Sequence, residues 1–369
     1  MMVVTDTLLM KRVTYDELKN GSYEISGDDY GIISDYFIRP TKDALLTNPN
    51  YDGSKTAVNL FYLNGKIVGR RIFMQTRIKT GEGFMLAQTG GGLEIHENFQ
   101  GKGLGTMLLQ DSVLNREYPI HIGQLYSSGA ISIFRKMDVT IFEKPLYYKL
   151  CRSRSVLSAK GFKGFSLSFL AFFGDIFLKI RNFPNLMKIR GLKKRFTIKK
   201  ESSIPEWVND ITLNDGHKYT EIHDQKWLQW NLDHMFSANP KDKNCFYAVY
   251  DKNGSPKGFY MTKERFEENK KGIFKNLIRG TVVEWGSVNE SELSEAELNL
   301  LALATFSPDV DKINTVISGE GVGKDIESIG FSYRGMYQMT FKADEDCDSD
   351  MTEQNKWRIR YGGCDTILV

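Results

Sequence analysis

Runs of apolar residues separated by turn residues follow one another along the first part of the chain. Such runs, rich in β-branched and aromatic residues, are typical of buried strands. The sequence therefore predicts strands over residues 57–63, 67–77, 84–95 and 120–126, and one strand or a pair of strands over 139–150. Asn64-Gly65 predicts a hairpin between the first two strands, because both residues tolerate positive φ. Helices are predicted from about Thr106 and over 129–136.

The N-terminal residues and the second half of the chain extend this pattern. Upstream, the sequence predicts a strand over 23–25 and a helix over 30–38 that Asp28 caps. Asn64-Gly65 has a counterpart in Asn253-Gly254, 189 residues later, and Gly69 has one in Gly258 at the same offset. A third match, offset by 190, joins the strand over 120–126 and Ser128-Gly129 to a strand over 313–317 and Ser318-Gly319. Three matches in order predict a duplicated domain.

The length of 369 residues fits two domains of ordinary size. We expect an N-terminal domain, a helical linker, a C-terminal domain and an acidic tail, at residues 1–150, 151–204, 205–342 and 343–369. The scattered cysteines show no C-x-x-C pair and no signal peptide precedes them, which predicts free thiols and a cytoplasmic protein. The five histidines show no metal-ligand spacing, so no metal site is predicted.

The linker concentrates positive charge beside a phenylalanine-rich stretch. The whole chain has a net charge of +3, yet residues 151–200 hold 13 Lys and Arg against one acid, Asp175. The apolar stretch 165–180 is too short to span a bilayer. It could lie on an anionic membrane as an interfacial helix, giving a peripheral membrane contact through 163–195, or it could be a linker helix buried between the domains, which is the commoner fate. No basic–aromatic strand pattern or known module points to nucleic acid.

The stretch from Gly90 to Gln110 carries the chemistry. A strand ending at Ile95 leads into a glycine-rich turn and then into a helix. Main-chain N–H groups at such a helix N-terminus converge on an anion, and the helix dipole favours negative charge there. Lys102 adds positive charge, so a pyrophosphate is the expected guest. The turn is not a P-loop, because no G-K-[ST] ends it, and it lacks the third glycine of a dinucleotide-binding fingerprint.

The residues Gln100-Gly101-Lys102-Gly103-Leu104-Gly105 fit the pattern Q/R-x-x-G-x-G/A, between a strand end and an apolar helix. This combination resembles the acetyl-CoA-binding loop of the GNAT N-acyltransferase superfamily. The resemblance covers residues 10–150 with the loop, and 205–342 by the repeat alone. It implies an α/β (α+β) fold of two tandem GNAT-like domains, with mixed, mostly antiparallel sheets and flanking helices.

The resemblance also implies a cosubstrate, acetyl-CoA or another acyl-CoA, and no metal. The main chain of Ile95 would bind the pantetheine, and Ser127 or Ser128 would lie near the pantetheine or the departing thiol. The side chain of Gln100 and the loop N–H groups would hold the pyrophosphate. The implied binding set is Ile95, Gln100, Gly101, Lys102, Gly103, Leu104, Gly105, Thr106 and Ser127.

The implied reaction is attack of an amine on the thioester carbonyl, with a small molecule or a peptide as acceptor. The family's positions for a general base hold Thr89 and Gly91, and its position for a tyrosine acid holds Phe134; none of these can exchange a proton at neutral pH. Four residues near the loop could replace the missing base or acid: Glu94, His96, Glu97 and Tyr126. Such residues are more often ordinary surface residues than catalysts, so we assign no catalytic residue. Two alternatives stay open: an acyl-CoA-binding module without turnover, and a tandem-GNAT aminoacyl or long-acyl transferase.

Two further features have two interpretations each. The triple glycine at 90–92 could leave room for an acceptor or mark a β-bulge. The cluster of Trp227, Trp230 and Phe236 could form the wall of an acceptor groove or ordinary core, and core is favoured. In the second copy, four acids stand at 290–297 where a pyrophosphate would lie, and Ser294 with Glu297 would cap a helix over 295–305. We therefore expect the second copy not to bind CoA.

Overall fold

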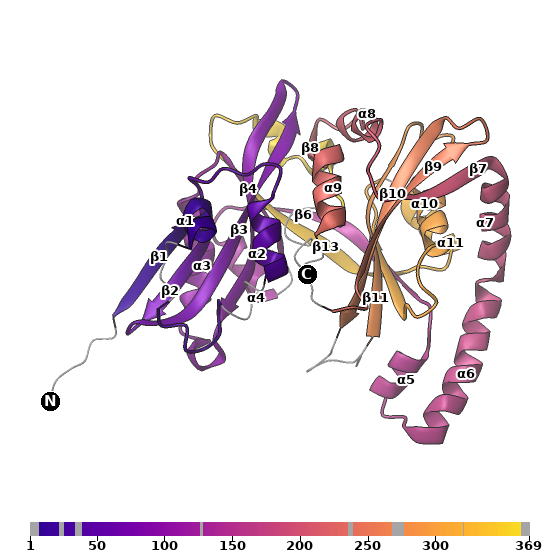
Figure 1. Cartoon of the computed structure of the whole chain (residues 1–369), viewed down its shortest axis with the longest axis horizontal. Helices are drawn as coiled ribbons and strands as arrows, with labels where there is room; N and C mark the ends of the chain where they lie inside the picture. The colour runs from indigo at the N-terminus through magenta and orange to yellow at the C-terminus, as the bar shows by residue number, and fades with distance from the viewer. Residues whose placement is uncertain are drawn as a thin grey trace.

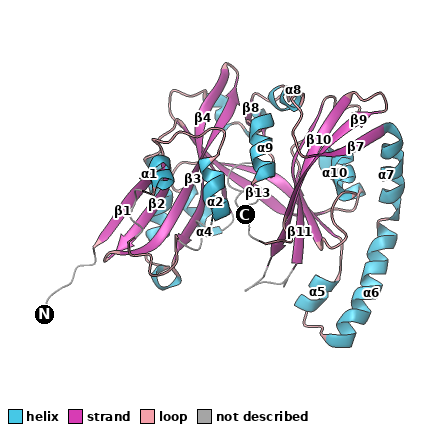
Figure 2. Cartoon of the chain, in the orientation of Figure 1, coloured by secondary structure: helices cyan, strands magenta, loops and turns pink. Residues whose placement is uncertain are grey.

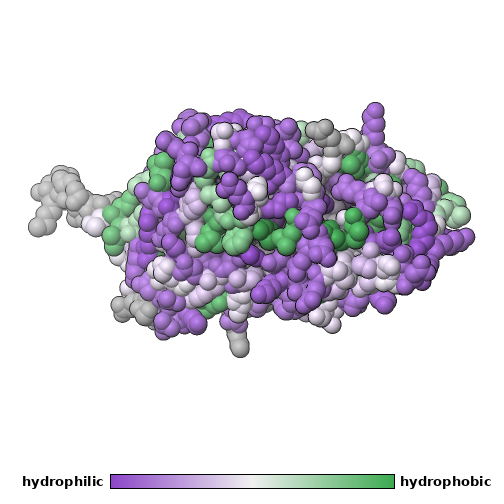
Figure 3. Space-filling view, turned by 90° about the horizontal axis from the view of Figure 1, so that it is seen from above, coloured by the Kyte–Doolittle hydropathy of each residue, from purple (hydrophilic) through white to green (hydrophobic). Residues whose placement is uncertain are grey.

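The computed structural model describes residues 7–21, 26–33, 39–125, 128–234, 239–267, 277–319 and 321–362. Figure 1 shows two α/β halves side by side, and Figure 2 shows that strands from both halves form the centre while helices cover the faces. The face seen in Figure 3 is mostly hydrophilic, with an apolar band along its middle.

The first half follows the order that its hydrophobic pattern predicts. Its strands are β1 (Leu8–Thr14), β2 (Thr56–Leu63), β3 (Lys66–Thr80), β4 (Gly83–Ile95), β5 (Ile120–Leu125) and β6 (Thr140–Leu150). Its helices are α1 (Tyr15–Asn20), α2 (Arg39–Leu46), a 3-10 turn at Glu97–Phe99, α3 (Leu104–Leu114) and α4 (Ser128–Arg135). Strands β1 to β4 pair antiparallel, and β5 runs parallel to β4.

The second half repeats this order after a helical connection of α5 (Arg154–Ala159), α6 (Gly164–Arg181) and α7 (Phe183–Arg195). Its strands are β7 (Phe196–Glu201), β8 (Tyr219–Glu221), β9 (Lys243–Asp251), β10 (Pro256–Glu267), β11 (Leu277–Ser287), β12 (Lys312–Val316), β13 (Ser332–Ala343) and β14 (Trp357–Arg358). Its helices are α8 (Val208–Leu213), α9 (Gln225–Asp233), α10 (Glu295–Leu303) and α11 (Val322–Ser328), with 3-10 turns at Ser349–Thr352 and Gln354–Lys356. Again one strand pair, β11 with β12, is parallel.

The two halves exchange their last long strands. The sheet order over the described residues is β1-β2-β3-β4-β5-β13-β6-β12-β11-β10-β9-β7. Strand β13 of the second half therefore pairs with β5, while β6 of the first half pairs with β12. One continuous sheet results, with matching strand orders on either side of the β13–β6 pair. The division at residue 150 remains a prediction, and the pairing of β6 ties that segment to both halves.

The repeated glycines have one structural role in both copies. Gly69 lies opposite Ile95, and a Cβ at Gly69 would clash with that side chain. Gly258 lies opposite Ser287, and a Cβ there would stand 2.7 Å from the carbonyl oxygen of Gly286. Each glycine therefore lets the end of the neighbouring strand approach closely. The two predicted hairpins form, with Gly65 and Gly254 at positive φ of 78° and 86°.

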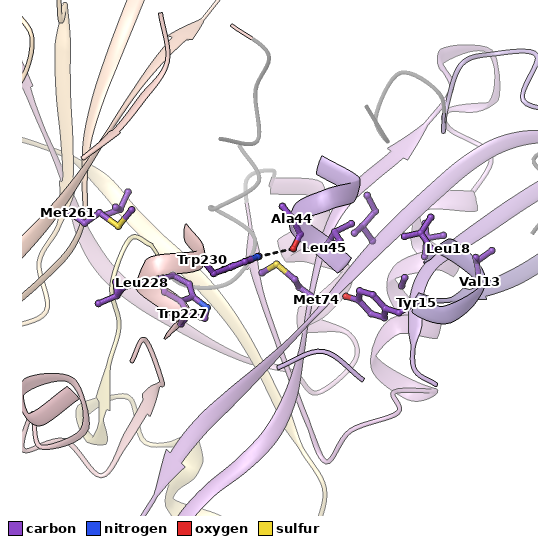
Figure 4. Close-up of a cluster of buried hydrophobic side chains, with 14 of the residues drawn as sticks. Val13, Tyr15, Leu18, Ala44, Leu45, Met74, Trp227, Leu228, Trp230 and Met261 are labelled. Carbon is purple, nitrogen blue, oxygen red and sulfur yellow. Dashed lines mark hydrogen bonds between the residues drawn. The ribbon is translucent and has the colours of Figure 1, made fainter. Parts of the chain in front are cut away.

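A single hydrophobic cluster draws buried side chains from both halves, as Figure 4 shows. Trp227 and Trp230 of α9 are 1% and 5% exposed, so the core interpretation of this pair is confirmed. The indole Nε1 of Trp230 donates to the carbonyl oxygen of Ala44 in α2 at 2.9 Å. Phe236, the third predicted member, lies outside the described residues.

The N-terminal predictions were the weakest. Residues 23–25 and 34–38 lie outside the described residues, and 30–33 are turn and irregular rather than helical. Asp28 nevertheless accepts a hydrogen bond from the main chain of Ile33 at 3.2 Å. The sequence pattern missed β1, α1 and α2. Thr14 starts α1 through a capping box with Glu17, which is a local signal that the sequence contains.

The connection α5–α7 runs along the outer edge of the second half, where Figure 1 shows α6 and α7 away from the first half. The interpretation of α6 as a helix buried between the domains is therefore wrong. Only Leu167, Ala171 and Leu178 of this helix are buried. The C-terminal segment, in contrast to α6, packs into the sheet. Trp357 of β14 is 1% exposed, and β14 pairs with β8, which also pairs with β3.

Candidate functional site

Strands β4 and β5 separate next to the glycine loop. Their parallel pairing runs from Ala87 opposite Ile120 to Gly90 opposite Gly123 and ends there. Strand β4 continues along β3 to Ile95. Between these points β4 carries a β-bulge, because residues 92 and 93 stand against one residue of β3, and Gly92 has φ of 54°. A bulge bends its strand. The interpretation of the triple glycine as a β-bulge therefore fits the structure, and the bulge lies where β4 and β5 stop pairing.

Gly90 has a second constraint. A Cβ there would clash with the guanidinium group of Arg71, which is 4% exposed. This glycine therefore lets a buried arginine cross the strand, and the room above it is occupied from within the chain.

The loop itself is open to solvent. Residues 100–103 are exposed, and Gly101 and Gly103 have φ of 78° and 82°. A Cβ at either glycine would meet nothing within 4 Å, so their conformation and not crowding requires glycine. Gly103 is the N-cap of α3 and no side chain caps the helix. The first N–H groups of a helix have no partner within it, and here they face the loop surface.

Contacts with the sheet and with the end of β4 fix the position of the loop. Leu104 and Leu108 of α3 pack with Phe61 and Val68 on the sheet. The side-chain amide of Gln100 donates to the carbonyl oxygen of Ile95 at 2.9 Å. Gln100 thus fixes the turn to the end of β4, with one further amide hydrogen left on the same nitrogen. The exposed Lys102 lies with its Nζ 5.2 Å from the ring centroid of Phe99.

Known proteins share the fold that carries this open glycine loop, although they share little of its sequence. No family model matches the sequence, and no curated protein matches it in sequence. Solved structures match over nearly the whole chain. The N-myristoyltransferase of Saccharomyces cerevisiae with bound myristoyl-CoA is 11% identical, with a TM-score of 0.57, over 97% of this chain and 90% of that one. The chain has the GNAT N-acyltransferase fold.

Two bacterial structures support the same fold. A protein of Enterococcus faecalis V583 described as a probable N-acyltransferase is 12% identical, with a TM-score of 0.54, over 92% of this chain and 73% of that one. A GCN5-related N-acetyltransferase of Anabaena variabilis is 9% identical, with a TM-score of 0.51, over 91% and 73%. The tandem GNAT fold that the sequence resemblance implied is thereby confirmed.

The GNAT fold brings most of the predicted binding residues together. Gln100 is bonded to Ile95 at the end of β4, and Gly103 is the N-cap of α3, whose first turn holds Leu104, Gly105 and Thr106. Of these, Leu104 has its side chain buried, so only its main chain could reach a ligand. Ser127 lies outside the described residues, and Ser128 begins α4 without a described side chain. The binding role of each residue stays a prediction.

Two of the four residues weighed as substitutes, Glu94 and His96, contact other side chains of the protein. Glu94 forms an ion pair with Arg70, whose side chain is 6% exposed. The ring of His96 stacks on Tyr30 with centroids 4.2 Å apart. Phe134, at the family's acid position, is 1% exposed and packs with Leu109 and Val113 of α3. Glu97 is exposed in the 3-10 turn, and Tyr126 lies outside the described residues.

Sequence reasoning missed a buried ionic cluster between the halves of the GNAT fold. His223 is 1% exposed, and its Nδ1 lies 2.5 Å from Glu284 of β11 while its Nε2 lies 3.5 Å from Glu221 of β8. Burial disfavours the imidazolium, but the Glu284 and Glu221 carboxylates outweigh it and raise the pKa of His223 to about 9. Residues 61 positions apart give no sequence signal for such a pair.

This cluster is packed rather than open. The imidazole stacks on Trp227 with centroids 3.6 Å apart, and Arg360 lies 3.4 Å from Glu284. The cavity beside it, bounded by Ile122 of β5 and Met339 of β13, has about 10 Å³ of free space. Since a water needs at least about that much, an acceptor does not fit there. Among the described residues, no group of three His, Cys, Asp or Glu side chains could hold a metal ion.

Helix α10 of the second half corresponds to α3, but side chains cap its N-terminus. Ser294 and Glu297 form the predicted capping box at the start of α10. Glu295, 7% exposed, accepts hydrogen bonds from the main-chain N–H groups of Ser318 and Gly319, each at 3.1 Å. A carboxylate of the chain thus occupies the N–H groups that follow β12. That the second copy does not bind CoA remains a prediction, and the capped, acidic first turn of α10 gives it a physical reason.

Proposed function

We propose that the protein is an acyl-CoA-dependent N-acyltransferase. The observation that carries the proposal is the open loop at the N-terminus of α3, with Gly101 and Gly103 at positive φ, next to the end of β4–β5 pairing. Main-chain N–H groups there bind the CoA pyrophosphate, and the helix dipole adds to the attraction. The fold shared with N-acyltransferases supports the same reaction.

Each part of the proposed site has a defined task. The N–H groups from Gly101 to Thr106 and the charge of Lys102 hold the diphosphate. The second amide hydrogen of Gln100 reaches the same anion while the first stays on Ile95. The pantetheine enters the gap where β5 leaves β4, and the free main chain of β4 near Ile95 binds its amides.

The proposed reaction is one displacement. The nitrogen lone pair of a neutral amine attacks the thioester carbonyl, a C–N bond forms, and the C–S bond breaks when the tetrahedral intermediate collapses. The nitrogen loses one proton to solvent, and the thiolate of CoA leaves or takes a proton. Positioning of two reactants can supply a large share of the rate, so the lack of an ionisable group at positions 89, 91 and 134 is compatible with turnover.

The donor is an acyl-CoA whose chain length needs its own test. Acetyl-CoA follows from the loop resemblance. A long-chain donor has support in the likeness to a myristoyltransferase over 97% of this chain. The acceptor is a small-molecule or peptide amine. Calorimetric titrations with CoA, acetyl-CoA and myristoyl-CoA compare the affinities of the two donors. A thiol-release assay over a panel of amines then compares their rates of acyl transfer.

Gly105→Glu is the sharpest test of the site. Gly105 has ordinary helical backbone and its Cβ would meet only Ile95 at 3.7 Å, so the fold tolerates a side chain while a carboxylate enters the anion surface. We expect CoA affinity to fall at least about a hundredfold, because a like charge and lost N–H access act together. A melting temperature close to that of the wild type shows that the fold is kept.

A matched control separates charge from backbone strain. Gly254 has φ of 86° and open space around it, like Gly103 with φ of 82°. Gly103→Glu and Gly254→Glu therefore carry similar strain, and only the first should weaken CoA binding. Unchanged affinity in Gly105→Glu and Gly103→Glu would remove CoA from the loop. Tight CoA binding without thiol release from any acyl-CoA and amine would favour the binding module instead.

A further inference from the structure

Helix α6 and the start of α7 expose an unusually apolar surface. Eight large apolar side chains of α6 and three of α7 are at least 37% exposed, and we call these eleven residues the α6 face. They are Phe165, Phe169, Leu170, Phe172, Phe173, Ile176, Phe177, Ile180, Phe183, Leu186 and Met187. Phe165 is 84% exposed and Ile180 is 68% exposed. Soluble monomers rarely leave a contiguous apolar area of this kind uncovered.

The rest of the helix fixes the direction of this face. The side chains that α6 buries, Leu167, Ala171 and Leu178, recur at intervals of four and seven residues and so share the opposite side. Asp175 accepts hydrogen bonds from the main chain and hydroxyl group of Ser153 at 2.7 and 2.8 Å. Gly174 allows this approach, since a Cβ there would stand 2.6 Å from the Ser153 hydroxyl oxygen. Because the opposite side of α6 is packed and hydrogen-bonded, the α6 face points toward solvent.

Positive charge surrounds the α6 face. Residues 160–195 contain nine Lys and Arg and one acid, and that acid is Asp175, which bonds to Ser153. Lys163 precedes the face, Lys179 and Arg181 end α6, and Lys188 and Lys194 are exposed on α7. Within the described residues these four lysines have no ion pair. An apolar helix side flanked by cations is the pattern of helices that lie in the interface of an anionic bilayer.

We propose that the α6 face docks the protein on an anionic membrane surface. The phenylalanine rings enter the boundary between headgroups and acyl chains, and the flanking lysines bind lipid phosphates. Over the described residues, no helix is both long and apolar enough to cross a bilayer, so α6 lies on the surface. A second copy of the chain fits the face poorly, because each copy brings the same nine cations. The proposal does not rest on the acyltransferase function.

Sedimentation with lipid vesicles tests this docking. The full chain is mixed with vesicles of phosphatidylcholine alone, or with about one third phosphatidylglycerol added for negative surface charge. We expect binding to the anionic vesicles to be at least about tenfold tighter, and to weaken as salt rises. Phe165→Ser combined with Phe172→Ser and Phe177→Ser should lower binding by at least about tenfold, because the inserted apolar area is lost.

Charge and control variants complete the design. Lys188→Glu with Lys194→Glu should weaken binding to anionic vesicles about tenfold or more and leave the neutral ones unaffected. The apolar control is Phe84→Ser with Leu114→Ser and Val288→Ser, at residues that are 58%, 67% and 56% exposed elsewhere. Lys19→Glu with Lys136→Glu is the charge control, at two exposed lysines at the ends of α1 and α4 in the first half, which Figure 1 shows far from α6. Both controls should bind like the wild type.

Several outcomes would overturn the proposal. Absence of vesicle binding, equal affinity for neutral and anionic vesicles, or wild-type binding by the triple serine variant would each do so. A dimer in sedimentation velocity that the triple serine variant dissociates would assign the α6 face to a second copy. Since all three phenylalanines are exposed, the triple variant should keep its melting temperature, and a thermal melt checks that its loss of binding is not loss of fold.

Discussion

The buried His223 makes stability depend on pH in a defined direction. Burial alone would lower the pKa of this imidazole, yet Glu284 at 2.5 Å and Glu221 at 3.5 Å raise its pKa to about 9. In an unfolded chain a histidine has a pKa of about 6.5. The folded protein therefore holds a proton that the unfolded chain releases when the pH rises above that value.

The sign and size follow from this difference. A pKa that is raised in the folded state contributes stability that is fully present below about pH 6.5 and is lost as the pH rises through 9. Each unit of pKa corresponds to about 1.4 kcal/mol. The shift from 6.5 to about 9 thus contributes roughly 3 kcal/mol at neutral and lower pH. This is a sizeable part of the free energy of unfolding of an ordinary domain.

Glu284→Gln removes the larger of the two attractions. Burial lowers the pKa of Lys149 to about 8 and also lowers that of Lys263, so these lysines stabilise the folded state as the pH rises and oppose the trend of His223. The quantity to measure is therefore the difference in the free energy of unfolding between the wild type and Glu284→Gln, by urea unfolding followed by tryptophan fluorescence between about pH 6 and pH 10. The wild type should lose stability relative to Glu284→Gln over that range, because burial keeps His223 neutral in the variant. The control is His217→Gln, at a histidine whose pKa burial lowers, and its slope at alkaline pH should equal that of the wild type.

One result would refute this account. It is a difference in the free energy of unfolding between the wild type and Glu284→Gln that stays constant from neutral to alkaline pH, which would assign the pH dependence to other groups. A direct check is the NMR titration of the imidazole carbons, in which the His223 signal should move with a midpoint of about 9.

Two smaller predictions concern packing and are measured by urea unfolding. Trp230→Phe should cost about 1–2 kcal/mol, because the buried bond from its Nε1 to Ala44 is lost; no change would mean that the α2–α9 contact is energetically neutral. Gly258→Ala should destabilise by about 1–3 kcal/mol, since its Cβ would press on the Gly286 carbonyl oxygen at 2.7 Å, whereas Gly191→Ala, in open space within α7, should stabilise by up to about 1 kcal/mol. Equal effects of the two alanines would contradict the close approach.

Features set by neighbouring residues were predictable from the sequence. The hairpin at Asn64-Gly65 forms because both residues adopt positive φ, of 52° and 78°. Helix α10 begins at the predicted Ser294 because its capping box needs only residues three apart. The glycine loop ends in α3 at Leu104, two residues before the predicted start. In each case a local conformational preference determines the outcome.

Features set by distant residues were not predictable. The exchange of β6 and β13 depends on which strand edges are free once both halves have formed, and no local pattern records that. The ionic cluster needs β8 and β11 to come together, so His223 carried no signal of its own. The α6 sequence was equally consistent with burial and exposure. Its apolar residues surround the helix, and only tertiary packing decides which side is covered.

The two halves differ at the helix that connects their parallel strands. Helix α3 lies between β4 and β5 in the first half, and α10 lies between β11 and β12 in the second. The loop before α3 exposes Gly101 and Gly103, and no side chain caps α3. A capping box closes the start of α10, and the Glu295 carboxylate in its first turn accepts hydrogen bonds from the N–H groups of Ser318 and Gly319 after β12. Because the acidic first turn of α10 already satisfies main-chain donors and repels a second anion, we expect a phosphate to bind only in the first half, where the helix N-terminus is open.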